Sequence, residues 1–294
     1  MKELYIHIGH YKTGTSAIQS YCSDHAKDLA KHGVFYPPTS RPSNNPTNHG
    51  DLSLMLAAKH GFTPPPWYGA EKKDIEEVYR AFFKSAQSAK QDKILVSSEE
   101  FLQLALRDNS EIAIEELRAR VSAFDVKILF YVREPMALLK SWYNEVNKGS
   151  HGTRNFIVFF RMLNINFLAQ YLVYQKFADV FGADKIMVRT YKDMGSAHIQ
   201  SFFQGIGCDL VPSEKGNKTI NKAQDLSVLE LARLAKRRDH DLEEATLSEF
   251  KSLKGLGRKI DTINEAFAQV SSVADVAHES QLSLYNIFSH LRDL

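Results

Sequence analysis

One short segment of the chain combines residue types that could bind an anion. Residues 9–16 read Gly-His-Tyr-Lys-Thr-Gly-Thr-Ser and follow an apolar run at 4–8 that predicts a β-strand. A glycine-bearing turn between a strand and a helix directs unpaired backbone N–H groups and the positive end of the helix dipole toward an anion. Lys12 adds a positive charge, and the hydroxyl groups add hydrogen-bond donors. The segment predicts an anion-binding loop, and the alternative is a tight turn that carries a surface lysine.

The order of residues in this loop differs from that of a Walker A motif. That motif needs a glycine, four residues and then Gly-Lys-Ser or Gly-Lys-Thr. Here Lys12 precedes Gly14, and Gly14 is followed by Thr15. The order disfavours a nucleotide kinase, which shares the strand, loop and helix and stays an alternative.

A second candidate site follows the strand predicted over 127–132. Arg133 comes directly after this strand, and Ser141 stands eight positions later on a helix predicted over 135–148. An arginine presents a fixed fork of donors to a phosphate, and a serine on the second turn of the helix adds a hydroxyl group. The alternatives are a helix-capping ion pair for Arg133 and an ordinary polar helix face for Ser141.

A third strand, predicted over 93–97, ends next to two carboxyl groups. Glu99 and Glu100 follow Ser98, and Glu99 is nearer to the strand end. A glutamate beside an anion site can act as a general base for a hydroxyl group. We prefer Glu99 in this role, while Glu100 stays possible. The alternative is that Ser98 caps a helix whose first turn is acidic.

The loop predicted over 37–50 supplies another candidate base. This stretch is rich in Pro, Asn, Ser and Thr, and long loops in compact domains often serve binding. His49 near its end could bind an acceptor or take a proton. The alternative is an exposed loop histidine without a chemical role.

Short apolar runs that alternate with helical patterns predict an α/β fold with a mostly parallel five-stranded sheet. Parallel sheets bind ligands at the carboxyl ends of their strands, where all three candidate sites lie. We expect one domain over 1–294, with an α/β core at 1–225 and a helical portion at 226–294. The strands are expected at 4–8, 34–36, 93–97, 127–132 and 185–189. The helices are expected at 17–30, 51–59, 71–90, 111–123 and 135–148, with a mostly helical stretch at 156–181.

The composition is that of a folded globular protein. The 294 residues carry a net charge of +2, with 44% hydrophobic and 24% charged residues. These values argue against disorder and against coating of nucleic acid by bulk charge. Cys22 and Cys208 are too few for a disulfide framework and predict reduced, buried thiols. No apolar run is long enough for a membrane span, and the first residues predict a strand rather than a signal peptide, so we expect a cytoplasmic protein.

Residues 7–19 resemble the 5′-phosphosulfate-binding loop of sulfotransferases that use 3′-phosphoadenosine 5′-phosphosulfate (PAPS). Bacterial carbohydrate-type members of this family often show a similar run. The spacing of Arg133 and Ser141 resembles that of the family's 3′-phosphate-binding element. The resemblance covers roughly 4–225 and departs at 217–221, where Asn-Lys-Thr-Ile-Asn replaces the more typical Asn-x-Ser-Leu-Ser.

The resemblance implies a P-loop-like three-layer fold and transfer of a sulfuryl group from PAPS to a hydroxyl group, leaving adenosine 3′,5′-bisphosphate (PAP). It implies a carbohydrate or glycolipid acceptor, and neither a metal nor nucleic acid takes part. The catalytic residues would be Lys12, Glu99 and His49. The donor would be bound by His10, Tyr11, Lys12, Thr13, Gly14, Thr15, Ser16, Arg133 and Ser141. A non-catalytic nucleotide-binding scaffold is a further alternative, and the identity of the acceptor, the oligomeric state and the role of the loop at 215–221 stay open.

Overall fold

The computed structural model describes residues 1–64, 68, 73–148, 155–164, 167–191, 196–210 and 212. The chain divides into two compact units. One contains Met1–Val132 with Val173–Ile220, and the other contains Arg133–Leu172 with Asn221–Leu294. The portion at 226–294, for which the sequence predicts helices, and the loop at 215–221, whose role the sequence leaves open, lie outside the described residues.

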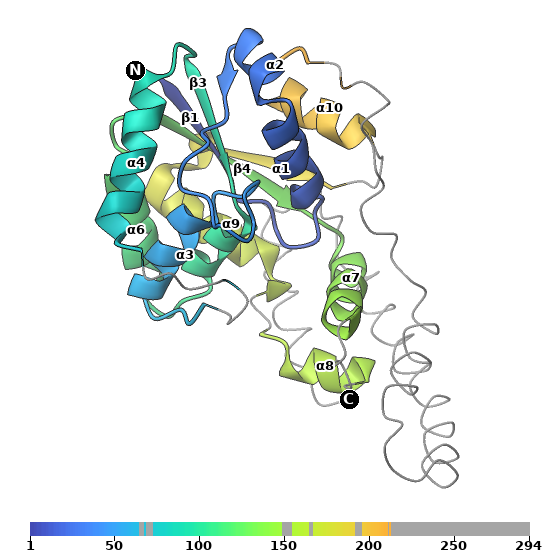
Figure 1. Cartoon of the computed structure of the whole chain (residues 1–294). Helices are drawn as coiled ribbons and strands as arrows, with labels where there is room; N and C mark the ends of the chain where they lie inside the picture. Colours follow the sequence, from blue (N-terminus) through green and yellow to red (C-terminus); the bar gives the residue numbers. More distant parts are fainter. Residues whose placement is uncertain are drawn as a thin grey trace, which may run out of the picture. The chain divides into compact units, whose positions relative to one another are not determined.

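The first unit is built on a parallel β-sheet. The described strands are β1 (Glu3–His7), β2 (Val34–Phe35), β3 (Lys93–Ser97), β4 (Asp125–Val132) and β5 (Ile186–Thr190). They lie in the order β2-β3-β1-β4-β5, and every neighbouring pair is parallel. The prediction of a five-stranded, mostly parallel α/β sheet is confirmed, and the described strands are all parallel (Figure 1).

The connections of neighbouring strands leave the centre of this sheet in opposite directions. The chain leaves β1 for the edge strand β2, whereas it leaves β3 to cross β1 and reach β4. Such a reversal opens a crevice at the carboxyl ends of the strands, where open α/β sheets bind ligands. The loop after β1 and the acidic pair after β3 both lie at these carboxyl ends.

One face of the sheet is covered by α1 (Thr15–Asp24), α2 (Ala26–Lys31) and α10 (Ser196–Gly205), as Figure 1 shows. Alternate strand residues point to this face, because successive side chains of a strand point to opposite sides. Tyr5, Leu95 and Leu129 pack there with Ile18 and Phe202 in one buried hydrophobic cluster. His7 continues the same alternation, so its side chain also lies on this face.

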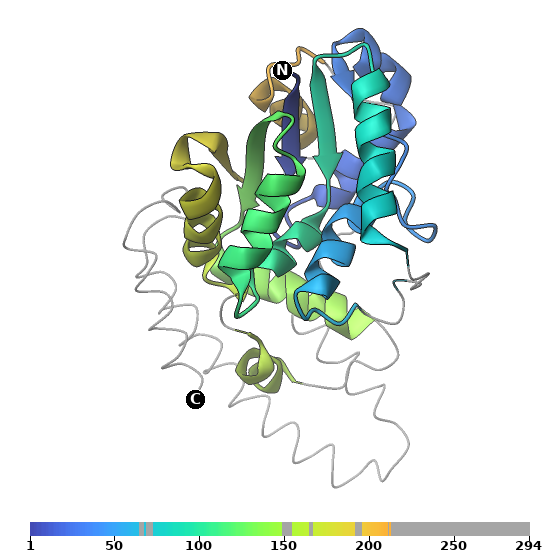
Figure 2. The ribbon, with the colours of Figure 1, turned by 90° about the vertical axis from the view of Figure 1, so that its left-hand side faces the viewer.

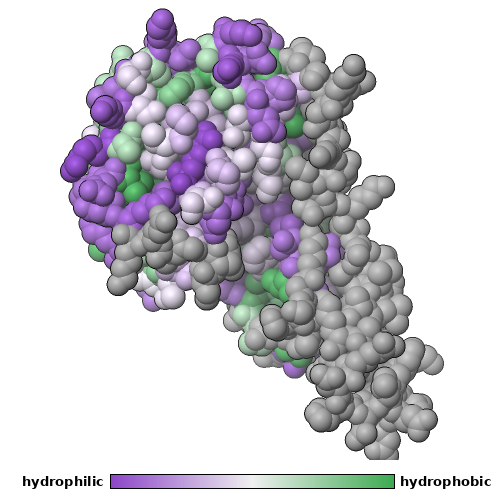
Figure 3. Space-filling view, in the orientation of Figure 1, coloured by the Kyte–Doolittle hydropathy of each residue, from purple (hydrophilic) through white to green (hydrophobic). Residues whose placement is uncertain are grey.

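The other face of the sheet carries the larger helical layer, seen in front of the strands in Figure 2. Leu4, Ile6 and Phe130 point to this side and are at most 1% exposed. The layer consists of α3 (Gly50–Lys59), α4 (Ile75–Ser88), the short α5 (Leu102–Ala105), α6 (Ser110–Arg120) and the part of α9 (Gln170–Phe181) from Val173 onward. Large hydrophobic side chains are thereby withdrawn from water, and hydrophilic residues cover most of the face of this unit drawn in Figure 3.

Several helix boundaries differ from the sequence prediction. The helix expected at 17–30 is interrupted at His25 and forms α1 and α2. The helix expected from 71 begins at Ile75, because the Asp74 carboxylate accepts the backbone N–H of Glu76 as an N-cap. The stretch at 156–181 contains two helices, α8 (Phe156–Met162) and α9.

The second unit contains α7 (Pro135–Lys148), α8 and the start of α9. The Glu134 carboxylate accepts the backbone N–H groups of Met136 and Ala137 and so caps α7, with Pro135 in the first turn, where no N–H is needed. Tyr143 of α7 is fully buried, edge-on to Phe156. Within the described part of the chain, no helix has the length and apolar character needed to cross a membrane.

Candidate functional site

The loop after β1 has the backbone conformation of an anion-binding turn. Lys12 and Gly14 both adopt positive φ angles, 64° and 78°, and α1 begins directly afterwards at Thr15. Left-handed residues turn successive backbone N–H groups toward one point, which makes a concave site for an anion. The first turn of α1 carries no acidic residue, so its positive dipole end is not neutralised there.

Three side chains of the loop are engaged in holding the loop itself. The Thr13 hydroxyl donates a hydrogen bond to the carbonyl of His10, and both side chains are fully buried. The Gln103 amide donates to the Tyr11 hydroxyl at 2.9 Å. The side chains of Tyr11 and Thr13 thus help to hold the loop, and His10 Nδ1 lies 3.3 Å from the carbonyl of Tyr11. The backbone N–H of His10 donates to the carbonyl of Tyr131 at 3.0 Å, so it is not among the groups that the loop offers to an anion. Ser16, by contrast, is exposed at the start of α1.

Three polar side chains close on the loop at Gly9, where there is no room for a Cβ atom. A Cβ atom at Gly9 would lie 2.6 Å from His7 Nε2, 3.1 Å from Thr13 Oγ1 and 3.2 Å from Thr15 Oγ1. His7 Nε2 and Thr15 Oγ1 are buried and have no hydrogen-bond partner among the described residues. Buried polar atoms are almost always paired, so two such atoms beside one glycine suit a ligand with oxygen acceptors.

Glu99 stands at the end of the neighbouring strand, in 3-10 helix η2 (Glu99–Phe101). Its Oε2 atom accepts hydrogen bonds from Gln19 Nε2 at 2.8 Å and from Asn48 Nδ2 at 3.3 Å. Burial, followed by the negative charge of Glu100, raises the pKa of Glu99 to about 7, although Gln19 and the positive charge of Lys12 act in the opposite direction. A carboxyl group with a pKa near neutrality is suited to take up and release a proton.

Glu100 has a different environment from its neighbour. Its Oε2 atom accepts the hydroxyl hydrogen of Ser98 and, at 3.1 Å, an N–H of Asn48. Asn48 thus joins the two carboxyl groups, and Ser98 is also 2.8 Å from Ser53 on α3. Ser98 stands at the N-cap position of η2 before an acidic first turn, as that alternative from the sequence had it, but its hydroxyl caps no backbone N–H and bonds Glu100 instead. These bonds fix Glu100 in place, which leaves Glu99 as the better base.

His49 is not an exposed loop histidine, and that alternative from the sequence is wrong. Its side chain is fully buried, with Nε2 at 2.9 Å from the carbonyl of Pro37 and Nδ1 accepting the backbone N–H of Ser97 at 3.2 Å. Burial and the positive charge of Arg41 lower the pKa of His49 to about 3. Both ring nitrogens are engaged in fastening the loop to β3, so we do not carry His49 forward as the base.

Arg133 and Ser141 belong to the second unit and are described within it. The side-chain amide of Gln170 accepts the backbone N–H of Arg133 at 2.9 Å and donates to its carbonyl at 2.7 Å. Ser141 lies on the second turn of α7 and is 8% exposed. The clamp fixes the backbone of Arg133 directly after the last residue of β4.

The sequence interpretation missed the hydrogen-bond partners of the base. Gln19 and Ser97 are almost fully buried, although glutamine and serine are mostly exposed in proteins. Gln19 shares the buried face of α1 with Ile18 and Cys22. A polar residue on the apolar face of a helix is the signal that could have identified it.

Comparisons with known proteins give only distant similarities, so the argument for function rests on the residues of this chain. No family model matches the chain, and no curated protein matches it. The solved structures similar to the chain include two sulfotransferases. A sulfotransferase from Alicyclobacillus acidocaldarius has 17% identity and a TM-score of 0.47, with 81% of this chain and 96% of that chain covered. A mouse sulfotransferase, SULT7A1 complexed with PAP, has 9% identity and a TM-score of 0.36, with 82% and 68% covered.

Proposed function

We propose that this protein is a sulfotransferase that moves a sulfuryl group from PAPS to a hydroxyl group. The observation that carries the proposal is the environment of residues 9–16. The segment resembles a phosphosulfate-binding loop and has two left-handed residues, a lysine and an uncapped helix start. It lies at the carboxyl end of the central strand, next to a glutamate whose pKa is raised to about 7.

The residues of the loop fit the anionic end of such a donor. The buried Oγ1 atom of Thr15, which has no hydrogen-bond partner among the described residues, offers a donor there. Lys12, Thr15 and Ser16 would hold the phosphosulfate together with backbone N–H groups of the loop. When bound, PAPS supplies an activated sulfuryl group on a phosphate leaving group.

Glu99 and Lys12 divide the work of transfer between them. Glu99 takes the proton of the acceptor hydroxyl, and its raised pKa lets it do so near neutral pH and return the proton to water. Lys12 stabilises negative charge that develops on the leaving oxygens, a role in which a fixed cation acts more strongly in the transition state than in the ground state. Asn48 and Gln19 hold the Glu99 carboxylate toward the loop side of the sheet end.

Arg133 and Ser141 would bind the 3′-phosphate of the donor. The guanidinium group of an arginine matches two phosphate oxygens at once. The Gln170 clamp on the Arg133 backbone supports this role, because a fixed backbone leaves fewer side-chain orientations to order on binding.

We propose a carbohydrate or glycolipid hydroxyl as the acceptor, on the similarity of the loop to bacterial carbohydrate-type members. The aromatic residues of α7 do not strengthen this choice. Tyr143 is fully buried against Phe156, and Trp142 contacts the Phe167 ring at 5.2 Å. Tyr143 is thus part of the core of the second unit, whereas Trp142 is partly exposed.

A nucleotide kinase is the second candidate, and one observation favours it. The acidic residues Glu99 and Glu100 follow a strand adjacent to the loop-bearing strand, and carboxylates near bound phosphates can hold magnesium. The position of Lys12 before Gly14 argues against it, since a kinase loop places the lysine after the glycine.

Calorimetric titration separates the two candidates. PAP and ATP with magnesium are titrated into the wild-type protein, with Lys12→Ala and Arg133→Ala as matched variants. We expect PAP to bind, ATP to give no response, and both variants to bind PAP more weakly. A preference for magnesium ATP, or no PAP binding by the folded wild type, would overturn the sulfotransferase proposal.

A further inference from the structure

A chain of buried hydrogen bonds runs from the candidate base to a histidine beneath the anion loop. Glu99 Oε2 is 2.8 Å from Gln19 Nε2, Gln19 Nε2 is 3.3 Å from Ser97 Oγ, and Ser97 Oγ is 2.9 Å from His7 Nδ1. His7 and Ser97 lie side by side as register partners at the ends of β1 and β3. The chain therefore joins both strand ends that make up the proposed site.

The supply of hydrogens fixes the direction of every bond in this chain. The amide nitrogen of Gln19 has two hydrogens, and it gives one to Glu99 and one to Ser97. The Ser97 oxygen thus accepts from Gln19, and its own single hydrogen is left for His7 Nδ1. His7 is then a neutral imidazole whose proton is on Nε2, in agreement with its complete burial.

Packing around the His7 ring fixes the orientation of this side chain. Nε2 lies against Gly9, and the ring packs 5.0 Å from Phe202 and 5.5 Å from Tyr131, measured between ring centroids. The Tyr131 ring lies at 76° and the Phe202 ring at 59° to the His7 ring, and this packing keeps Nδ1 directed at Ser97. The direction of the Ser97 hydroxyl is therefore set by packing.

We propose that His7 is a positioning residue for the transfer. By accepting the hydrogen of Ser97, it makes Ser97 an acceptor, so that the N–H side of the Gln19 amide faces Glu99. Without His7, the Ser97 hydroxyl can donate to Gln19, and the amide can turn its carbonyl oxygen toward the base. This inference rests on the proposed function, because it assigns His7 a part in that same site.

Charged and titratable groups surround both ends of this chain of hydrogen bonds, and a test of it must leave them unchanged. Lys12 of the loop and Glu100 of η2 act on the charge of Glu99, and Tyr11 and Tyr36 also interact with it electrostatically. His7 is faced by Tyr131 of β4 and by His198 of α10. A positive charge on His198 would disfavour the protonated, cationic form of His7. Substitutions at His7 and Ser97 leave each of these groups in place.

The titration of Glu99 tests the proposal without any acceptor. The side-chain carboxyl carbons of glutamate are labelled with ¹³C and followed by NMR over pH, and the Glu99 signal is assigned by its loss in Glu99→Gln. We expect a midpoint near 7 in the wild type. His7→Phe removes the acceptor but keeps an aromatic ring, and we expect it to raise the midpoint by ~1 pH unit, since a donor to the charged form is lost. His7→Asn can still accept from Ser97, and we expect a midpoint close to that of the wild type.

An unchanged midpoint in folded His7→Phe would overturn the proposal. If that variant does not fold, Ser97→Ala decides the question, because it cuts the chain at its centre. The same rise of the midpoint is expected there, and no rise would contradict the inference. Binding of PAP is measured alongside, so that absence of PAP binding in the wild type refutes the proposed function, whereas the midpoints alone decide the role of His7.

Discussion

Glu99 and Glu116 are two partly enclosed glutamates of one unit whose acidities differ by about five pH units. The pKa of Glu99 is raised to about 7, and that of Glu116 is lowered to about 2. Burial acts in the same direction on both, because it disfavours a charged carboxylate. The difference must therefore come from the groups that surround them.

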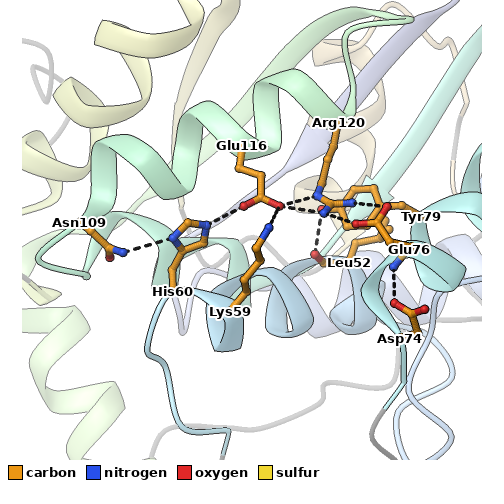
Figure 4. Close-up of polar contacts among 9 residues, drawn as sticks. All are labelled: Leu52, Lys59, His60, Asp74, Glu76, Tyr79, Asn109, Glu116 and Arg120. Atoms are coloured by element: carbon orange, nitrogen blue, oxygen red, sulfur yellow. Dashed lines mark hydrogen bonds and ion pairs between the residues drawn. The ribbon is translucent and has the colours of Figure 1, made fainter.

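Glu116 on α6 is the centre of a network of ion pairs, drawn in Figure 4. Its carboxylate is 2.8 Å from Lys59 Nζ, 2.9 Å from His60 Nε2 and 2.8 Å from Arg120. Arg120 continues to Glu76 on α4 at 2.7 Å. The network joins α3, α4 and α6, and its hydrogen bonds outweigh burial, so that Glu116 stays ionised.

Glu99 has neighbours of another kind. The hydrogen bonds that it accepts within the described part of the chain come from neutral amide groups, and a second carboxyl group adjoins it. The contrast teaches that cations in direct contact make a carboxylate a structural anchor, whereas amides hold it in place and leave its proton exchangeable. Only the second arrangement serves acid–base chemistry at neutral pH.

Removing the Glu99 carboxylate should have the largest effect. We expect Glu99→Gln to lower the rate of sulfuryl transfer ~10²–10⁴-fold, the usual contribution of a general base, while PAP binds as in the wild type. Turnover is measured with labelled PAPS, and Glu116→Gln serves as the matched control. A transfer rate in Glu99→Gln equal to that of the control would show that Glu99 is not the base.

Loss of the Lys12 charge should come next. Lys12→Ala should reduce transfer by ~10²–10³-fold, as for other groups that stabilise developing negative charge. Lys12→Gly removes the same charge and suits the positive φ of 64°. We expect both variants to be equally inactive and Lys12→Gly to melt at the higher temperature, and higher activity in Lys12→Gly would show that the backbone matters more than the charge.

Arg133→Ala should act on binding of the donor. Loss of a charged hydrogen-bond donor from a phosphate site should weaken PAP binding by roughly 10–100-fold. Arg133→Lys retains the charge but not the fork, so an intermediate dissociation constant is expected in calorimetry. Equal affinities in all three proteins would remove Arg133 from the site.

The smallest effects concern stability and pH. Glu116 has a folded pKa of about 2 and an ordinary value of 4.5, so the stability that it contributes is complete above about pH 4.5 and is lost as the pH falls toward 2. We expect Glu116→Gln to lower the free energy of unfolding at pH 7 by about 1–2 kcal/mol and to flatten its pH dependence below 5. Urea titrations at several pH values measure this.

Glu99 should make the free energy of unfolding depend on pH in the opposite direction. Its folded pKa is about 7 and its ordinary value is 4.5, so the folded state binds the proton more tightly than the unfolded chain does. The unionised form is therefore favoured by folding, and stability falls as the pH rises from about 4.5 through 7. In Glu99→Gln this decline should disappear, and a wild-type decline that persists in the variant would locate it elsewhere.

The sequence predicted the parallel sheet well because each strand is a short apolar run between turn residues, as at 93–97 and 127–132. It also predicted the strand, turn and helix around residues 9–16, since the glycines of the turn are visible in the sequence. It failed for His49, because nothing in a loop sequence tells whether its histidine turns inward to bond Pro37 and Ser97. The bonds of Gln19 and Asn48 to Glu99 were missed for a related reason, although the place of Gln19 on the apolar face of α1 was a signal for a buried polar role.

Gln19 and Asn48 reach Glu99 across 80 and 51 positions of the chain. Such contacts depend on the tertiary fold and not on local spacing. The sequence favoured Glu99 over Glu100 as the candidate base from its place nearer the strand end, but the bond from Ser98 that holds Glu100 is visible only in the structure.

The reactivity of the two buried cysteines reports how often one helical layer of the molecule opens. Cys22 on α1 and Cys208 after α10 lie in the hydrophobic cluster that seals one face of the sheet, and they are 0% and 2% exposed. A thiol reagent can reach them only while this layer is open, so its reaction rate counts opening events. Since α1 also begins at the anion loop, a ligand held there should lengthen the interval between openings, and the rate would report occupancy of the loop before any acceptor is known.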